Sequence, residues 1–473
     1  MINKDKIIQT FTNNIQHLLA ELVPSEKRRL VSLAVEIEKI DFAELAGALS
    51  ESETDYLCWS QPESEFSFLG IGSLFTATAD GNSRTTITEQ KIEELREGFI
   101  NNWNDFNLSG VPLILGGMKF SANYQSELWE DYHDSDWFIP NFLLLSFSGK
   151  TYLIYNFFPD NSGAQLILDK LDAFLNDLNV PKEKNDNPHD FSIVFSNEDD
   201  ETEKNEWIEK VNRTLDEIRK GIFTKIVLSR SVSLKFDGAP GLSILLSELS
   251  KKYPRCFIFA FHKNNSTFFG ASPERLAKLH DGIIEADALA GSLPRGETPE
   301  EDRRLEEELL NSEKNLAEQN VVVEFIAESF SDFTSDIEYN EKPVIRKLPN
   351  IQHLWTPIKA KLTEGQNVFS ILKTIHPTPA ICGSPWTVAL DSIIKTENYD
   401  RGLFAGIVGW FNFNNEGEFA VSIRSAIIKG AELRAFAGCG IVEGSDPILE
   451  YEETKLKLKP ILSLFKYEVA NKS

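Results

Sequence analysis

The sequence has little of several features that mark common protein classes. Its 473 residues include four cysteines, and no two of them form a CxxC pair. The longest apolar stretch, residues 402–411, is far shorter than the roughly 18 to 20 residues that a membrane-spanning helix needs. The first residues, MINKDKIIQTFTNN, lack the apolar core of a secretory signal. We therefore expect a cytoplasmic protein with free thiols and no membrane partner.

Positive charge is also scarce. The chain has 48 Lys and Arg against 73 Asp and Glu, so its formal net charge is −25. Nucleic acids and anionic membranes bind to basic surfaces, because their phosphates need cations. The charge balance therefore argues against a nucleic-acid or anionic-membrane partner. The oligomeric state stays open between a monomer and a weak dimer.

The usual catalytic motifs are missing as well. The chain has no GxxxxGK[ST] phosphate loop, no HExxH zinc motif, no GxSxG nucleophile elbow and no spaced Cys/His cluster. The segment AGCGIVEG contains Gly438 and Gly440 but lacks the third glycine of a dinucleotide-binding turn. A simple turn between a strand and a helix explains this segment equally well.

Aromatic residues, by contrast, are abundant. The chain has 33 Phe, and aromatic residues make up 11% of it. Such side chains need a dry interior, so a disordered chain is excluded, and the length favours two or three domains.

Apolar spacing in the first 160 residues predicts helices and then strands. Residues recur at intervals of three to four over 7–19 and over 30–40, which predicts helices there. Short apolar runs predict strands, with a hairpin turn at 148–150. These strands span residues 56–75, 113–120, 138–147 and 151–158.

The polar, acidic segment 181–206 is the best candidate for a linker. It divides the chain into an N-terminal part, 1–200, and a core, 201–473. A strand is predicted at 223–234, and helices at 207–218 (with Gly221 as its C-terminal cap), 299–330 and 446–465. Strands outnumber short βαβ units, so we expect an α+β fold with large, mostly antiparallel sheets.

Two charged residues lie in apolar surroundings. Lys225, in FTKIVLSR, is either a lysine at a sheet edge with its head in water or a desolvated amine. Burial disfavours the ammonium form, so a desolvated lysine can act as a base. Glu274, in FFGASPERL, either starts a helix or faces an apolar cavity, where a raised pKa would let it donate a proton.

Three glutamates lie on predicted helices. Glu318 follows SEKNLA, and Glu450 and Glu453 share one helix face at a spacing of three. They form either a solvated acidic face or a site for Mg²⁺, which prefers carboxylate oxygens and bridges to anionic substrates. Lys457, four residues after Glu453, is either a helix ion-pair partner or a substrate-facing cation.

Two further residues could have either a structural or a functional role. Arg424, on an alternating strand pattern, either forms a cross-strand ion pair or binds a substrate carboxylate through its two-pronged guanidinium. His376, in IHPTPAICGSP, is either a structural hydrogen-bonding residue or a functional group.

Nine segments, in this order, carry a family resemblance: KIVLSRSV, FFGASPERL, ALAGSLPRG, SEKNLAEQNVVVEFI, IQHLWTPI, TIHPTPAICGSP, RGLFAGIVGW, FAVSIRSA and AGCGIVEGSDPILEYEETKLK. Together they closely resemble the chorismate-utilising enzymes, which include isochorismate synthase, salicylate synthase, anthranilate synthase component I and aminodeoxychorismate synthase. The match runs from about residue 205 to 465. The resemblance implies that family's fold, with large antiparallel sheets packed as a sandwich and helices outside.

The resemblance also implies roles for the residues singled out above. Lys225 would be the base that activates water, and Glu274 the acid that protonates the leaving hydroxyl. Glu318 and Glu453 would hold Mg²⁺, with Glu450 nearby. The substrate chorismate would be bound by Arg424, Lys457, the backbone at Gly438 and Gly440, and residues of the TIHPTPA and RGLF segments that include His376, Ala380 and Phe404.

Details of the motifs distinguish the members. Ala290 stands where aminodeoxychorismate synthases carry a nucleophilic lysine, and anthranilate synthases typically lack a lysine at the position of Lys225. Ala380 and Phe404 are similar to the residues that isochorismate synthases carry at these positions, whereas salicylate synthases typically carry threonine and tyrosine there. Two positions depart from the common pattern: Asn315 replaces an acid and Ser292 a threonine.

The resemblance thus implies an isochorismate synthase, with salicylate synthase and a non-catalytic chorismate-binding protein as alternatives. The long N-terminal part resembles the menaquinone branch, and a siderophore role stays open.

Overall fold

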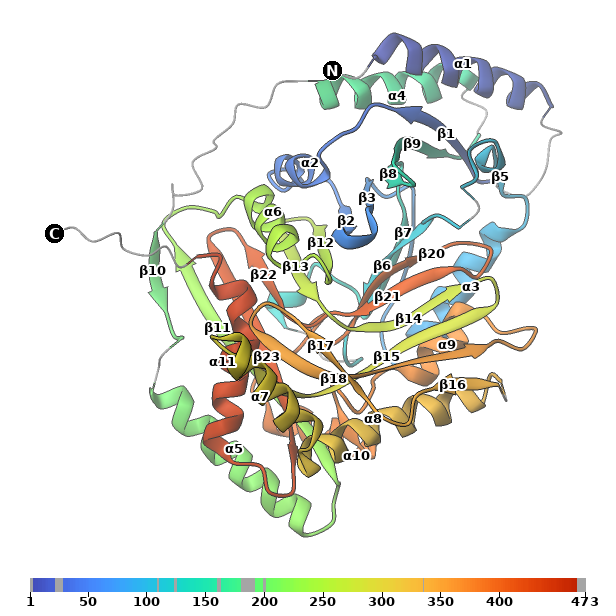
Figure 1. Cartoon of the computed structure of the whole chain (residues 1–473). Coiled ribbons are helices and arrows are strands. Elements are labelled where there is room, and N and C mark those ends of the chain that lie inside the picture. Colours follow the sequence, from blue (N-terminus) through green and yellow to red (C-terminus); the bar gives the residue numbers. More distant parts are fainter. Residues whose placement is uncertain are drawn as a thin grey trace.

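The computed structural model describes residues 3–21, 29–108, 110–122, 126–159, 163–179, 192–198, 201–334 and 336–465. Within these ranges the chain forms two β-sheets, of thirteen and ten strands, with helices outside them (Figure 1). Neighbouring strands in these ranges pair antiparallel, except for the parallel pair β1–β5. The predicted α+β class with large antiparallel sheets is confirmed. None of the helices described is both long and apolar enough to cross a bilayer.

The first sheet has the order β10-β11-β23-β22-β13-β12-β2-β3-β8-β9-β1-β5, with β19 paired to β11. It takes strands from both sides of residue 200. Its strands are β1 (Val31–Ile37), β2 (Tyr56–Gln61), β3 (Phe66–Ile71), β5 (Ile100–Asn101), β8 (Phe142–Phe147), β9 (Lys150–Phe157), β10 (Ile193–Ser196), β11 (Lys225–Phe236), β12 (Phe257–Lys263), β13 (Ser266–Ser272), β19 (Gly383–Ser384), β22 (Ser425–Lys429) and β23 (Glu432–Val442).

The second sheet has the order β16-β18-β15-β14-β21-β20-β6-β7-β4, with β17 paired to β18. Its strands are β4 (Phe75–Ala79), β6 (Ile114–Met118), β7 (Ser135–Ile139), β14 (Arg275–His280), β15 (Ile283–Pro294), β16 (Ile337–Tyr339), β17 (Val344–Lys347), β18 (Ile351–Lys361), β20 (Ile407–Phe411) and β21 (Gly417–Val421).

Helices cover the outer faces, and α1 and α4 lie side by side over β1 in Figure 1. The α-helices are α1 (Lys4–Glu21), α2 (Phe42–Leu49), α3 (Arg84–Arg96), α4 (Gly163–Asn179), α5 (Glu201–Arg219), α6 (Leu242–Lys252), α7 (Pro299–Leu310), α8 (Glu313–Ser331), α9 (Val368–Ile375), α10 (Trp386–Thr396) and α11 (Pro447–Leu462). Three short 3₁₀ helices are η1 (Pro62–Ser64), η2 (Trp103–Phe106) and η3 (Glu127–Trp129).

Two apolar layers hold these elements together. One lies between the sheets and contains Trp59 of the first sheet and Trp137 of the second. The other lies between the first sheet and its helices and contains Phe11 of α1 and Leu171 of α4. Successive residues of a strand point to opposite faces, so strands of the first sheet contribute to both layers.

The prediction of a helix over residues 30–40 is wrong, because this segment forms β1. Val31, Leu33 and Val35 face the helix-side layer, whereas Leu30 and Ala34 face the layer between the sheets. A strand buried on both faces is a continuous apolar run, and such a run also contains the three- to four-residue spacings of a helix.

Two other predicted elements are each divided in the structure. The helix predicted over 299–330 is two helices, because the Ser312 side chain accepts a hydrogen bond from Asn315 N and starts α8 anew. The strand predicted over 138–147 is β7 followed by β8, with Pro140 between them, and proline cannot donate to a central ladder. The hairpin predicted at 148–150 is confirmed: β8 pairs with β9, and Ser148 and Gly149 both have positive φ.

The proposed linker is partly wrong. Residues 193–196 form β10, which pairs with β11 at the edge of the first sheet, and α5 starts at Glu201. The part of the predicted linker from 181 to 191 lies outside the described residues. The predicted helices at 7–19, 207–218 and 446–465 are confirmed as α1, α5 and α11.

Candidate active site

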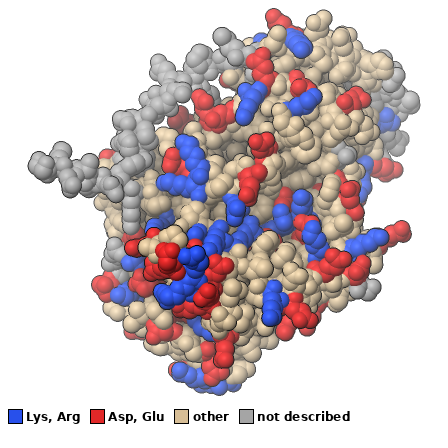
Figure 2. All heavy atoms as spheres, viewed as in Figure 1, with Lys and Arg blue, Asp and Glu red and all other residues tan. Residues whose placement is uncertain are grey.

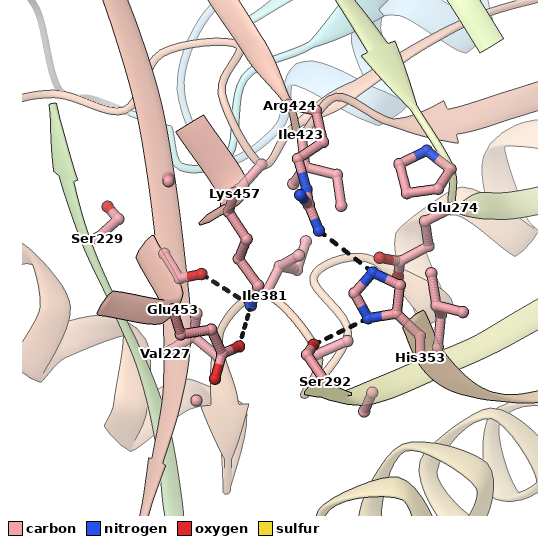
Figure 3. A pocket seen from close by; sticks show the side chains of 18 of the residues that line it. Val227, Ser229, Glu274, Ser292, His353, Ile381, Ile423, Arg424, Glu453 and Lys457 are labelled. Carbon is pink, nitrogen blue, oxygen red and sulfur yellow. Dashed lines mark hydrogen bonds and ion pairs between the residues drawn. The ribbon is translucent and has the colours of Figure 1, made fainter. Parts of the chain in front are cut away.

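A cavity lies between the two sheets, where β11 and β23 of the first sheet face β15 and β18 of the second. Helices α8 and α11 and the loops around residues 273, 380, 403 and 424 complete its wall. Figure 3 shows charged side chains from separate elements converging on it. The lining residues with acidic or basic side chains are Glu274, Glu318, His353, Arg401, Arg424, Glu453 and Lys457.

Glu274 lies in the tight connection between β13 and β14, so the alternative that it starts a helix is wrong. Its backbone N–H donates to Ser272 Oγ at 3.2 Å, and its carbonyl accepts from Val421 N at 3.1 Å. The side chain is 3% exposed and lines the cavity. Burial raises the pKa of Glu274 to about 8, and Asp287 adds to the rise. The carboxyl group is therefore mostly protonated at neutral pH.

Lys225 is the first residue of β11, and its side chain is buried, so the alternative of a lysine with its head in water is wrong. Its Nζ lies 2.9 Å from Glu318 Oε1. Burial alone would raise the pKa of Glu318, but Lys225, and after it Lys457 and Lys314, hold the pKa of that carboxyl below its ordinary value. The pair is therefore a buried ion pair at the edge of the cavity.

The acidic face of α11 is covered by lysines. Lys457 Nζ lies 2.7 Å from Glu453 Oε1 and donates to Gly438 O at 3.0 Å, as the dashed lines in Figure 3 show. Although burial disfavours its ammonium form, Glu453 holds the pKa of Lys457 above its ordinary value. Behind them, Lys314 Nζ donates to Glu450 Oε1 at 2.7 Å. The solvated-face alternative is wrong for Glu450, which is 1% exposed.

Arg424, another cation that lines the cavity, is held by a histidine. Its Nη2 lies 3.2 Å from His353 Nε2, and His353 Nδ1 lies 2.9 Å from Ser292 Oγ (Figure 3). Burial, together with the charge of Arg424, keeps the pKa of His353 well below its ordinary value, so the ring is neutral. A guanidinium has no acceptor, so Nε2 accepts from Arg424 and Nδ1–H donates to Ser292. This geometry leaves Arg424 Nη1 buried with no protein partner among the described residues.

The donor set of Glu318, Glu450 and Glu453 fits a hard divalent cation. Glu450 Oε2 is buried and has no hydrogen-bond partner in the part of the chain described. Their carboxylate oxygens do not all lie within 4.8 Å of one another. In the described ranges that condition is met by His280, Asp281 and Glu416, of which the first two are exposed. Mg²⁺ needs no complete protein cage, because it commonly uses one or two carboxylates and keeps several waters.

A sequence model of the family described as "Chorismate binding enzyme" matches residues 15–466 of this chain. The chain belongs to the chorismate binding enzyme family.

Similar proteins agree with this membership. The isochorismate synthase MenF of Bacillus subtilis is 34% identical over 96% of this chain and 97% of its own length. The salicylate biosynthesis isochorismate synthase of Pseudomonas aeruginosa is 31% identical, over 91% of this chain and 88% of that protein. These two proteins resemble this chorismate binding enzyme across both its parts, before and after residue 200.

Solved structures show the same fold. The putative 2,3-dihydroxybenzoate-specific isochorismate synthase DhbC of Bacillus anthracis superposes with a TM-score of 0.68 at 26% identity, covering 89% of this chain and 99% of that one. The menaquinone-specific isochorismate synthase MenF of Escherichia coli gives a TM-score of 0.77 at 22% identity, covering 97% and 100%. The second likeness bears on the fold alone.

Most of the predicted site residues of this chorismate binding enzyme come together at the cavity. Those that line it without a titrating side chain are Ala380, Phe404, Gly438 and Gly440. Lys225 and Glu450 are not lining residues. Lys225 contacts the lining residue Glu318, and Glu450 contacts Lys314.

His376 is not brought to the cavity surface. Its Nε2 lies 3.2 Å from Ala405 O, and burial lowers the pKa of the ring to about 3. A neutral ring donates that bond, so His376 holds the turn at Ala405, a lining residue with φ of +59°. Direct substrate contact by His376 stays a prediction.

Sequence reasoning gave no role to two lining residues of this chorismate binding enzyme, His353 and Arg401. Arg401 donates to Glu397 Oε1 at 2.6 Å, to Val227 O at 2.7 Å and to Ile381 O at 2.9 Å. Glu397 and Arg401 are four residues apart, a spacing that is also typical of exposed helix pairs. Their positions could have pointed to a role, because His353 lies in IQHLWTPI and Arg401 in RGLFAGIVGW, two of the segments that carry the family resemblance.

Gly440 leaves room for the pair of Lys225 and Glu318. A Cβ at this position would lie 2.5 Å from Glu318 Oε1 and 3.0 Å from Lys225 Cε. We expect Gly440→Ala to displace both side chains and reduce kcat/KM on the order of 100-fold, since small misplacements of reacting groups have effects of that size. The measurement is steady-state kinetics with chorismate.

The matched control for this variant is Gly238→Ala, because a Cβ there meets nothing within 4 Å. Gly238→Ala should have a melting temperature close to that of the unmodified chain, whereas Gly440→Ala should melt at a lower temperature because the added methyl group strains the buried pair. Full activity in Gly440→Ala would contradict the close packing of this pair.

Proposed function

We propose that this chain is an isochorismate synthase, which converts chorismate reversibly to isochorismate. Water adds at C2 of the ring, two ring double bonds shift, and the hydroxyl at C4 leaves. The atoms balance, because one water is consumed and the leaving hydroxyl departs as water once protonated. Such a reaction needs a base, an acid and cations for two carboxylates.

The observation that carries this proposal is Glu274, a carboxyl group that keeps its proton at neutral pH while facing a cavity lined by cations. Hydroxide is a poor leaving group, so a proton must reach it as the bond to C4 breaks. Glu274 is the buried acid placed to deliver that proton.

Lys225 is the proposed base. In its neutral form the buried amine removes a proton from the water that attacks C2. This form arises when the proton of the Lys225–Glu318 pair leaves the site, and the contact with Glu318 fixes the amine at the edge of the cavity. The proton that Lys225 gains and the one that Glu274 loses leave the net charge of the site unchanged over one turnover.

Arg424 and Lys457 are the proposed ligands of the substrate carboxylates. Arg424 Nη1 is buried and has no protein partner in the described structure, so it offers a donor to an anion in the cavity. Gly438 and Gly440 have no side chains, which lets the ring approach the backbone of β23. Figure 2 shows Lys and Arg side chains among the acidic ones over the middle of this face, so the surface seen there is not uniformly acidic despite the net charge.

Mg²⁺ is the proposed cofactor, held by Glu318 and Glu453 with Glu450 behind them. When bound, the ion supplies positive charge for a substrate carboxylate. In the structure these carboxylates are paired with Lys225, Lys457 and Lys314.

Incubation of the purified protein with chorismate, in Mg²⁺ or in EDTA, tests this function when the products are separated by chromatography. We expect isochorismate alone, formed with Mg²⁺, lost with EDTA and restored by excess Mg²⁺. Salicylate together with pyruvate would overturn the assignment in favour of a salicylate synthase. Binding of chorismate without turnover in either condition would contradict enzymatic function altogether.

A further inference from the structure

Asp287 is a buried carboxylate that the proposed mechanism does not use. It lies on β15 and is 4% exposed. Its Oδ1 accepts a hydrogen bond from Trp355 Nε1 at 2.9 Å. Its Oδ2 accepts from Arg346 Nη1 at 2.9 Å and from the backbone N–H of Arg275 at 3.4 Å. Because Arg275 directly follows Glu274, Asp287 holds the peptide that carries the proposed acid.

Arg346, the partner of Asp287, is itself fixed on several sides. It lies on β17, its Nη2 donates to Arg255 O at 3.3 Å, and its guanidinium lies 5.3 Å from the centre of the Trp355 ring. Trp355 therefore contacts both members of the ion pair. The charges of Asp287 on β15 and Arg346 on β17 are thus held close to Glu274, and Trp355 on β18 packs against both.

Glu274 faces more positive than negative charge. Lys225 on β11, Lys457 on α11 and Arg346 on β17 each favour its ionised form, and the guanidinium of Arg424 also interacts with it. His353 on β18 is neutral. Burial and Asp287 act in the opposite direction. Asp287 is thus the carboxylate that offsets the surrounding cations.

We propose that Asp287 and Arg346 are positioning residues for Glu274: Asp287 holds the adjacent peptide and its negative charge favours the protonated acid, whereas the positive charge of Arg346 limits that effect. The inference deepens the proposed function, on which it rests for the role of Glu274 as the acid. Neither residue lines the cavity, so both act through Glu274 and not on the substrate.

The two members of the pair should have opposite effects on the pH profile. Asp287→Asn removes the negative charge and keeps the shape, so the alkaline limb of kcat should move down by about one pH unit. Arg346→Gln removes the positive charge, so the same limb should move up by a similar amount. A merely structural role would lower activity in both variants without opposite shifts. Shifts in one direction, or none, would overturn the inference.

A second readout does not depend on turnover. The infrared band of the protonated Glu274 carboxyl can be followed through a pH titration, with Glu274→Gln as the blank that lacks the band. Its midpoint should fall in Asp287→Asn and rise in Arg346→Gln. Unchanged midpoints would contradict the inference even in an active enzyme, whereas shifted midpoints in a protein that leaves chorismate untouched would contradict the proposed function alone.

Two further variants guard against effects of stability. Arg346→Lys keeps the positive charge, so its midpoint should stay at that of the unmodified chain. Asp136→Asn is the matched control, because Asp136 is also a buried carboxylate paired with a cation, Lys263 at 2.8 Å, and does not line the cavity. A shift as large in Asp136→Asn as in Asp287→Asn would overturn the specific role of Asp287.

Discussion

Lys225→Met is expected to lower kcat for chorismate by roughly 10²- to 10⁴-fold, the range that removal of a general base produces. Methionine keeps the apolar stem of the buried side chain but cannot accept a proton. The loss should appear in kcat more than in KM, because a general base acts in the transition state and contributes little to substrate binding. Initial rates of isochorismate formation over a range of chorismate concentrations provide the measurement.

The same variant should also destabilise the protein. Removing Lys225 leaves Glu318 without its partner at 2.9 Å. Breaking one side of a buried ion pair costs on the order of 3 kcal/mol of unfolding free energy, because the remaining charge stays desolvated. Urea unfolding measures this loss independently of activity.

Lys235→Met is the matched control for this prediction. Lys235 lies on the same strand, β11, but it is exposed and pairs with Glu432 on the neighbouring strand. Its replacement should change neither kcat nor stability appreciably, since exposed pairs contribute little. A Lys225→Met enzyme with kcat close to that of the unmodified chain would rule out Lys225 as the base.

Glu274→Gln is the second change with a large expected effect. Glutamine is close in shape but has no acidic proton, so kcat should again fall by roughly 10²- to 10⁴-fold. In the unmodified enzyme kcat should decline as pH rises through about 8, where Glu274 loses its proton. Residual activity in Glu274→Gln should lack that alkaline limb, and its persistence would contradict the role of Glu274 as the acid.

The difference in unfolding free energy between this variant and the unmodified chain should depend on pH with a defined sign. The pKa of Glu274 is about 8 in the folded chain and 4.5 in a free side chain. Between pH 4.5 and about 8 the folded state therefore holds a proton that the unfolded chain releases. The contribution of the protonated Glu274 to the unfolding free energy is fully present below pH 4.5 and is lost as pH rises through about 8. The full loss is roughly 5 kcal/mol. Glu274→Gln, which does not titrate, should gain stability relative to the unmodified chain as pH rises.

Urea unfolding at several pH values between about 5 and 9 measures this difference. Glu338→Gln is the control, because Glu338 is exposed on β16, and its stability difference should not vary with pH. A constant difference between Glu274→Gln and the unmodified chain would mean that the carboxyl does not ionise at an elevated pKa.

Local patterns predicted many elements but not their limits. Amphipathic spacing located α1, α5 and α11, and the turn residues located the β8–β9 hairpin. The same spacing misassigned residues 30–40, because β1 is covered on both faces and has no polar side to reveal its period. The break at Ser312 was also missed, since one capping hydrogen bond decides it.

The candidate site was predictable where single residues stand out. Lys225 is conspicuous as a charged residue inside an apolar strand pattern, and Glu274 as a charged residue between apolar flanks. His353 and Arg401 are less conspicuous, because their importance comes from partners far away in the chain: Arg424 for His353, and Val227 for Arg401. No local pattern contains that information.

The sequence by itself determined the family, the antiparallel α+β class and the residues able to act as acid, base and ligands, since these depend on residue types and their local order. Only the tertiary structure decided which of these groups are buried and which charges face one another. Asp287 shows why: it affects Glu274 through contacts among β14, β15 and β17, and the free energy of a buried charge depends on all its neighbours in space.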